Sequence, residues 1–192
     1  LKKIYLVDNI SNQRFNILFG INNKKINFIY GDLTNSLFCK KLPNVDVVLH
    51  LASITNAEKS FEDKKKVFKN NLGSFKNILD YCLKKKAKLI HISSTSVYGS
   101  QKGVVNELVK LKPQSPYAEV KCKEELILIR QNKVKYITLR FGTMLQFEHV
   151  LSVCQQFLVK GEHIRCFKYS PGFPFKQLTR KNKNNKRKTC KQ

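Results

Sequence analysis

The sequence predicts an α/β fold: a doubly wound, mostly parallel sheet covered by helices on both faces. Short apolar runs typical of strands alternate with longer segments that carry the apolar stripe of a helix. The run from Asp46 to Leu51 has few polar breaks, as expected of a strand that is buried on both faces. The length of 192 residues suits one domain of ordinary size.

Strand-like segments of this kind occupy residues 4–7, 26–30, 46–51, 88–92 and 135–141. Several of them run directly into polar residues, as at Asp8, Asp32 and Ser94. Ligands bind at the carboxyl ends of the strands in open parallel sheets. We therefore expect a site where these polar residues meet.

Helical periodicity is clearest in residues 61–86. Apolar side chains there recur at spacings of 7, 4, 3, 4 and 3: Phe61, Phe68, Leu72, Phe75, Leu79 and Cys82. A second helix begins with Ser115 as N-cap and Pro116 at the first helical position, and runs to about Gln131. A third is expected over residues 150–159, ended by Gly161.

The composition is strongly basic, with a net charge of +24. Of the basic residues 31 are Lys and only 6 are Arg, and Asn occurs 17 times. Nucleic-acid surfaces use the bidentate guanidinium of Arg as well as Lys, so we interpret the charge as compositional bias and expect no nucleic-acid partner. No apolar run approaches the roughly 20 residues of a membrane span, and no signal peptide is visible, which predicts a cytoplasmic protein.

The six cysteines include no CxxC pair, so we expect no metal site and predict reduced thiols in the core. The composition changes near residue 168. Residues 168–192 hold nine basic residues and no acidic one, and residues 180–192 read as disordered.

The segment Tyr117-Ala-Glu-Val-Lys121 carries the strongest chemical signal. Residues four apart share one face of a helix, so the phenol and the ammonium point the same way. A fixed positive charge favours the phenolate and allows the tyrosine to act as a base. With so many lysines the spacing alone is weak, and the alternative is a surface tyrosine beside a solvated lysine. The strand that ends in Ser93 and Ser94 would place a hydroxyl donor beside Tyr117.

Several segments in the same order strengthen this interpretation: residues 31–34, 46–53, 70–74, 88–99, 117–121 and 139–142. Together they resemble the extended short-chain dehydrogenase/reductase superfamily, in particular its NAD-dependent nucleotide-sugar epimerases and dehydratases. The resemblance runs from about residue 5 to about residue 167 and implies a Rossmann-type NAD-binding fold.

The resemblance implies a catalytic role for Tyr117 as the base that takes a proton from a sugar hydroxyl while a hydride leaves for NAD. It implies that Lys121 lowers the pKa of Tyr117 and holds the nicotinamide ribose, and that Ser94 hydrogen-bonds the reacting oxygen. Further cofactor contacts are implied for Asp8, Asp32, Leu33, Leu51, Ala52, Ser53, Asn70 and Ser93. A carboxylate at Asp8 favours NAD over NADP, although Asp8 and Asp32 could equally be ordinary turn residues. We expect His50 and His91 to be core residues.

The sequence departs from the family at both ends. It lacks the GxxGxxG turn that lets the backbone approach a pyrophosphate, and residues 1–7 match the family's second strand. We therefore expect open strand edges where a first strand would lie, and weak NAD binding by what would be a fragment. The predicted division is an incomplete NAD-binding domain (1–148), the start of a substrate-binding region (149–167) and a disordered or frameshifted basic tail (168–192).

The leading hypothesis is an NAD-dependent epimerase or dehydratase that acts on a nucleotide-activated sugar, with a homodimer formed through the two long helices. One alternative is an NAD(P)-dependent reductase of a small carbonyl compound. The other is a basic nucleic-acid-binding domain without catalytic activity, whose affinity would fall steeply with salt.

Overall fold

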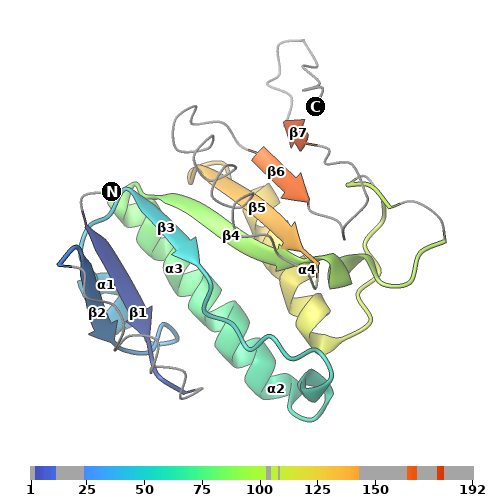
Figure 1. Cartoon of the computed structure of the whole chain (residues 1–192), viewed down its shortest axis with the longest axis horizontal. Helices are drawn as coiled ribbons and strands as arrows, with labels where there is room; N and C mark the ends of the chain where they lie inside the picture. Colours follow the sequence, from blue (N-terminus) through green and yellow to red (C-terminus); the bar gives the residue numbers. More distant parts are fainter. Residues whose placement is uncertain are drawn as a thin grey trace.

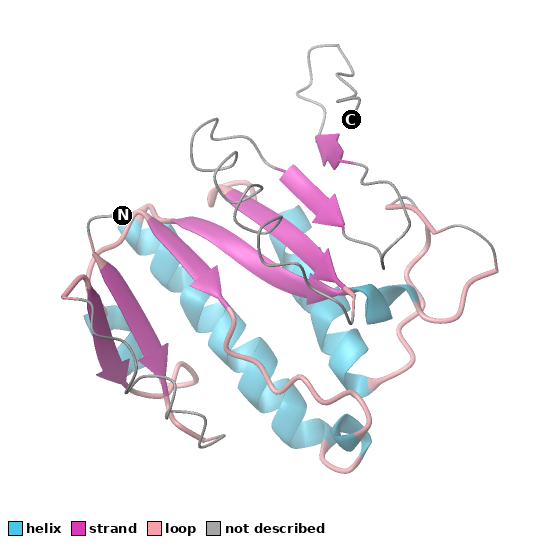
Figure 2. Cartoon of the chain, in the orientation of Figure 1, coloured by secondary structure: helices cyan, strands magenta, loops and turns pink. Residues whose placement is uncertain are grey.

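The computed structural model describes residues 3–11, 24–102, 105–107, 109–142, 164–167 and 177–179. They form one parallel sheet and one mostly parallel sheet, with helices packed against them (Figures 1 and 2). The strands are β1 (Ile4–Asp8), β2 (Ile26–Tyr30), β3 (Val47–His50), β4 (Lys88–Ser94), β5 (Tyr136–Phe141), β6 (Ile164–Phe167) and β7 (Gln177–Thr179). The helical elements are α1 (Ser36–Lys41), η2 (Lys59–Phe61), α2 (Lys64–Val67), η3 (Phe68–Leu72), α3 (Gly73–Lys85), η4 (Thr95–Tyr98) and α4 (Pro116–Arg130).

The strand predictions are confirmed to within two residues at each end. β1 pairs in parallel with β2, while β3, β4, β5 and β6 form a second parallel sheet that β7 extends in the antiparallel direction. No backbone ladder joins β1 to β3 in the described part of the chain. Leu49 of β3 keeps 45% of its surface exposed.

The helix predicted over residues 61–86 is interrupted. A 3-10 turn, η2, comes first, the Asp63 side chain then caps α2 by accepting from the Lys66 N–H, and a π-helical turn, η3, leads into α3. Phe61 was predicted to lie on the apolar stripe and is 63% exposed, because the chain turns before the regular helix begins. α1 was not predicted, although Asn35 caps it through hydrogen bonds from the Leu37 and Phe38 N–H groups.

α4 begins as predicted. The Ser115 hydroxyl oxygen accepts from the Ala118 N–H at 3.2 Å, and Pro116 occupies the first helical position. At the end of η4 the backbone of Gly99 has a φ of +62°, and a side chain there would overlap the Lys112 carbonyl oxygen. The helix predicted over residues 150–159 lies outside the described residues. In the basic segment 168–192, residues 177–179 form β7.

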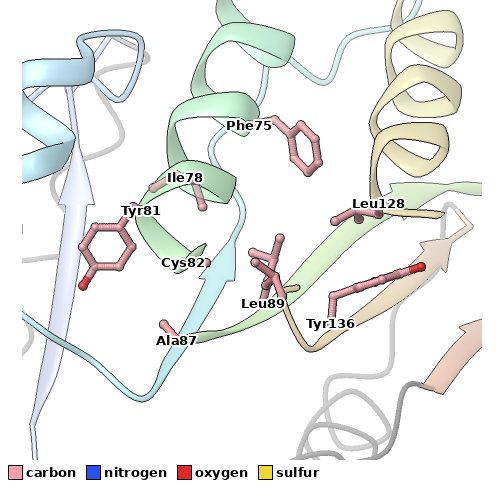
Figure 3. Packing of buried hydrophobic residues seen from close by; sticks show 9 residues of the cluster. Phe75, Ile78, Tyr81, Cys82, Ala87, Leu89, Leu128 and Tyr136 are labelled. Carbon is pink, nitrogen blue, oxygen red and sulfur yellow. The ribbon is translucent and has the colours of Figure 1, made fainter. Parts of the chain in front are cut away.

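One face of the larger sheet packs against α3 and α4, and Figure 3 shows this core. Phe75, Cys82 and Leu89 are fully buried there, with Leu128 of α4 and Tyr136 of β5 beside them. Neighbouring residues on a strand face opposite sides, so Ile90 belongs to a second cluster on the other face, with Ile137 and Leu139. The described helices α3 and α4 cover only the first face.

α3 also holds the smaller sheet in place. The Asn77 side chain donates to the Leu33 and Thr34 carbonyl oxygens, each at 2.9 Å, and the Tyr81 hydroxyl donates to the Pro43 carbonyl. These bonds fix the chain between β2 and β3 against the helix. The carboxyl ends of β1, β3 and β4 consequently face the same end of the molecule (Figure 1).

Cys39, Cys82 and Cys122 are buried free thiols, as predicted. Burial raises their pKa values to about 11, 12 and 11, so they stay protonated. No helix in the described ranges is long and apolar enough to cross a membrane. The same residues contain no group of three or more His, Cys, Asp or Glu side chains that could bind a metal ion.

Candidate active site

Tyr117, Lys121 and Ser94 come together at the carboxyl end of β4. Tyr117 lies in the first turn of α4, where the Ser60 hydroxyl oxygen accepts from its backbone N–H at 3.3 Å. Its side chain hydrogen-bonds with Ser94, the last residue of β4. The Lys121 ammonium lies 5.9 Å from the centre of the Tyr117 ring, as expected for residues one helical turn apart. The three predicted catalytic residues therefore share one site.

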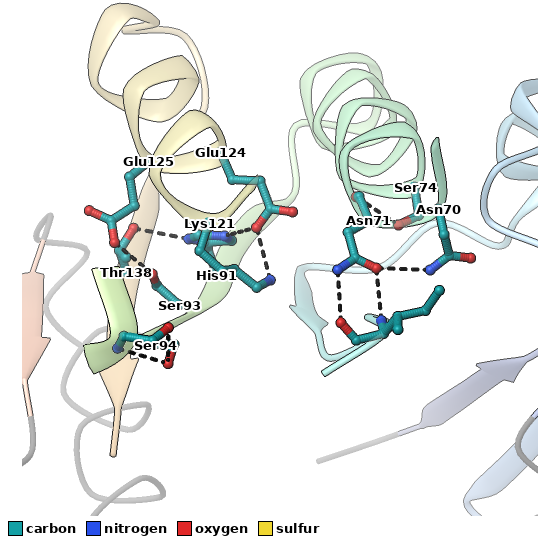
Figure 4. Close-up of polar contacts among 12 residues, drawn as sticks. Asn70, Asn71, Ser74, His91, Ser93, Ser94, Lys121, Glu124, Glu125 and Thr138 are labelled. Carbon is teal, nitrogen blue, oxygen red and sulfur yellow. Dashed lines mark hydrogen bonds and ion pairs between the residues drawn. The ribbon is translucent and has the colours of Figure 1, made fainter. Parts of the chain in front are cut away.

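Burial is the main influence on the Tyr117 phenol. Burial, followed by the negative charge of Glu124, raises its pKa to about 12, and the hydrogen bond with Ser94 opposes this only in part. Lys121 is paired with Glu124 (Figure 4). That Lys121 lowers the pKa of Tyr117 stays a prediction.

Glu124 is the centre of a buried network on the inner face of α4. Its Oε2 atom lies 2.9 Å from the Lys121 Nζ and 2.8 Å from the His91 Nε2, and all three side chains are 3% exposed or less. Burial acts to raise the pKa of Glu124, but the hydrogen bond from His91 and the charge of Lys121 outweigh it, and the pKa lies below its usual value. Glu124 is therefore a carboxylate at neutral pH.

His91 is neutral in this network, because burial lowers its pKa more than Glu124 raises it. An ionised carboxylate only accepts, so Nε2 carries the proton, and Nδ1 is left to accept from the Thr138 hydroxyl at 3.4 Å. His50 is buried beside it on β3, and burial lowers its pKa to about 3. The prediction that both histidines are core residues is confirmed.

The chain was compared with known proteins, and residues 2–145 match the family described as the NAD-dependent epimerase/dehydratase family. The chain belongs to this family.

Individual relatives agree with that assignment. An uncharacterised UDP-glucose epimerase of Bacillus subtilis is 29% identical over 126 residues, which are 63% of this chain and 40% of the relative. The solved UDP-N-acetylglucosamine 4-epimerase of Methanobrevibacter ruminantium, 25% identical, superposes with a TM-score of 0.67 over 87% of this chain and 61% of its own. A UDP-glucuronic acid 4-epimerase variant of Bacillus cereus, solved with a UDP-sugar analogue and NAD, is 28% identical, with a TM-score of 0.64 over 71% of this chain and 47% of its own. The chain thus spans less than half the length of the first of these relatives and about half to three fifths of the two solved structures.

The cofactor contacts predicted from the family lie around the same end of the sheets. Asp8 and Asp32 are exposed, at the end of β1 and just after β2. Each also closes a turn, since Asp8 Oδ1 accepts from the Ile10 N–H at 2.6 Å and Asp32 Oδ1 accepts from the Thr34 N–H at 2.7 Å. Their carboxylates could hold ribose hydroxyls, but the turn role explains them as well.

The segment after β3 offers further contacts. Leu51 and Ala52 are exposed, and the Ser53 hydroxyl oxygen is buried without a hydrogen-bond partner in the described structure. A bound ligand could satisfy such an atom, so this segment fits a cofactor that lies along the strand ends. Leu33 differs: its side chain packs against the core cluster, and its carbonyl accepts from Asn77.

Two predicted contacts have hydroxyl or amide groups that are already engaged. Ser93 is 2% exposed, and its hydroxyl donates to Glu125 Oε1 at 2.6 Å. Asn70 donates to the Oδ1 atom of Asn71 at 3.0 Å. The cofactor contacts of both residues remain predictions.

Asn71 has a role that the sequence did not reveal. It is fully buried in η3, accepts from the Ile54 N–H at 2.7 Å and donates to the Ile54 carbonyl at 3.0 Å. This amide pair holds the segment that follows β3 against the helix (Figure 4). The adjacent asparagines gave a signal, but the π-helical turn decides which of the two points inward.

Glu124, Glu125 and Arg140 were not predicted either. The Arg140 Nε and Nη2 atoms donate to the two carboxylate oxygens of Glu125 at 2.8 and 2.5 Å, and its Nη1 donates to the Tyr98 hydroxyl at 2.8 Å. Consecutive glutamates near the middle of a helix suggest solvent exposure, so nothing in the pattern distinguished these two. Only the packing of α4 on β4 and β5 shows that both are buried.

Proposed function

We propose that this chain carries the catalytic part of an NAD-dependent epimerase or dehydratase that acts on a nucleotide-activated sugar. The observation that carries the proposal is the convergence of Ser94, Tyr117 and Lys121 at the carboxyl end of β4, in a chain that belongs to this family. Relatives named as UDP-sugar epimerases support the substrate class.

In this mechanism the Tyr117 phenolate accepts the proton of a sugar hydroxyl while the hydrogen on the same carbon leaves as hydride. NAD, when bound, supplies the hydride acceptor. Ser94 donates a hydrogen bond to the sugar oxygen that loses its proton, and Lys121 places a positive charge near the phenolate. Asp8, Asp32 and residues 51–53 would hold the cofactor, and the unpartnered Ser53 hydroxyl supports this assignment.

The test is turnover of UDP- and dTDP-sugars with added NAD, followed through NADH absorbance and product analysis, with Tyr117→Phe as the matched variant. Loss of the phenol hydroxyl removes the base, so the rate should fall at least about a hundredfold. Equal turnover by the two proteins would remove Tyr117 from the mechanism.

NAD binding is a separate question. We expect this chain to bind NAD weakly, because it lacks the glycine-rich turn that lets a backbone approach pyrophosphate. Calorimetric titration of the chain with NAD measures this directly. A dissociation constant in the low micromolar range would contradict the expectation.

We further propose a homodimer through α3 and α4. Both helices expose a leucine: Leu83 is 41% exposed on α3 and Leu126 is 46% exposed on α4. Light scattering should give the mass of a dimer, and a monomer that persists at high protein concentration would oppose it. A cytoplasmic location also remains a prediction.

A further inference from the structure

Glu124 is placed to control the lysine of the candidate active site. It lies three residues after Lys121, so its carboxylate reaches the ammonium within one turn of α4. The same oxygen accepts from His91, which anchors the carboxylate to β4 (Figure 4). The buried side chains of Glu124 on α4 and His91 on β4 therefore hold the Lys121 ammonium in place.

The Lys121 and Glu124 charges form a buried ion pair. Lys121 is 3% and Glu124 1% exposed, so solvent screens their interaction poorly. Lys121 pairs with the Oε2 atom of Glu124, and the buried Oε1 atom has no hydrogen-bond partner in the described structure. The Glu124 carboxylate therefore offsets part of the Lys121 charge that acts on the neighbouring phenol.

We propose that Glu124 is a positioning residue: it fixes Lys121 beside the Tyr117 ring, offsets its charge, and thereby controls how readily Tyr117 gives up its proton. The proposal rests on the proposed function only in treating Tyr117 as the catalytic base. The contacts that it uses belong to the chain itself. The raised pKa of Tyr117, to which burial contributes most and the Glu124 charge next, agrees with it.

Other titratable groups surround this network on the packed elements. Those facing it are His50 on β3, His91 on β4, Glu125 on α4 and Arg140 on β5. The two histidines are neutral, and Glu125 and Arg140 neutralise each other through two hydrogen bonds. Glu124 is thus the acidic group whose removal most changes the field at Tyr117.

The test is an alkaline titration of tyrosinate absorbance on the chain without ligand. The sequence has 7 Tyr and no Trp, so the difference between each protein and its Tyr117→Phe counterpart isolates Tyr117. In Glu124→Gln the negative charge that acts to raise the pKa of Tyr117 is removed, so this pKa should fall by about one unit or more. An unchanged titration in a folded Glu124→Gln protein, checked by circular dichroism at each pH, would overturn the proposal.

Glu119→Gln is the matched control, because it makes the same change on the same helix in an ion pair with Lys64 that remains 56% and 37% exposed. It should leave the Tyr117 titration unchanged. If Glu124→Gln does not fold, the double variant Lys121→Met with Glu124→Met leaves no buried charge unpaired and decides the question. If the pKa of Tyr117 is the same in the double variant as in the unaltered chain, the charges of Lys121 and Glu124 offset each other, which supports the proposal. If that pKa rises by one unit or more, Glu124 did not offset the Lys121 charge, which overturns the proposal.

These measurements need neither NAD nor a sugar. The positioning role can therefore fail while Tyr117→Phe still abolishes turnover, and it can hold while the substrate class proves wrong.

Discussion

Glu124 and Glu125 are consecutive residues on α4 and both are buried, but their contacts differ. Glu125 uses both oxygens on Arg140 and also accepts from Ser93, so α4, β4 and β5 are joined by a satisfied network. Glu124 uses one oxygen for both Lys121 and His91, and its other oxygen has no partner in the described structure. Complete satisfaction is typical of a structural pair, whereas an incomplete one beside reactive groups is typical of a functional site.

The largest effect is expected from removing the carboxylate of Glu125. Glu125→Ala leaves the buried Arg140 without its carboxylate partner, so the free energy of unfolding should fall by about 3–5 kcal/mol. Urea denaturation measures the loss. A change below about 1 kcal/mol would mean that the network adds little to stability.

The next largest effect is expected in the pH dependence of stability, through the buried histidines His50 and His91. His50 and His91 have pKa values below the usual one, so the unfolded chain binds more protons than the folded chain once the pH falls below about 6.5. Stability should therefore fall as the pH is lowered from about 7 to about 5, by up to about 1.4 kcal/mol per pH unit for each histidine.

His50→Leu is the matched variant, because it removes one of the two histidines and leaves the hydrogen bonds of Glu124 with His91 and Lys121 in place. The slope of unfolding free energy against pH should become less steep by up to about 1.4 kcal/mol per pH unit, which corresponds to one bound proton fewer. An unchanged slope would show that His50 does not stay neutral in the folded chain.

An uncharged network provides the third comparison. Asn71→Ala removes both hydrogen bonds to Ile54, and the free energy of unfolding should fall by about 1–3 kcal/mol. Asn70→Ala, one residue earlier and only partly buried, should have a smaller effect. Thermal unfolding of the two variants compares them, and the reverse order would contradict the inward placement of Asn71.

The smallest effect is expected at the exposed ion pair between α2 and α4. The Lys64 ammonium lies 2.9 Å from Glu119, but both side chains are substantially exposed. Lys64→Ala should change the free energy of unfolding by no more than about 1 kcal/mol, and less at high salt. Urea denaturation at low and high salt tests this, and a larger loss would place Lys64 in a more important packing role against Phe68.

Much of the fold could be predicted because its signals are local. The apolar runs predicted five strands, Ser115 and Pro116 predicted the start of α4, and Tyr117 with Lys121 predicted a shared helix face. The interrupted helix around residues 59–72 was not predicted; its π-helical turn contains Asn71, whose hydrogen bond with Ile54 joins residues 17 apart in the sequence. α1 does have a local signal, because Asn35 is a residue type that favours the N-cap position.

The fold class, the family and the three residues that meet at the end of β4 could be inferred from the sequence. Those features follow from periodicity, capping and the order of short motifs, which are properties of neighbouring residues. The charge state of the site depends on the tertiary structure. Whether Lys121 acts as a free cation or as half of an ion pair depends on Glu124 and His91 being buried together, and burial is set by how α4 packs on β4. Desolvation strengthens such interactions and shifts pKa values, and no linear pattern of residues reveals it.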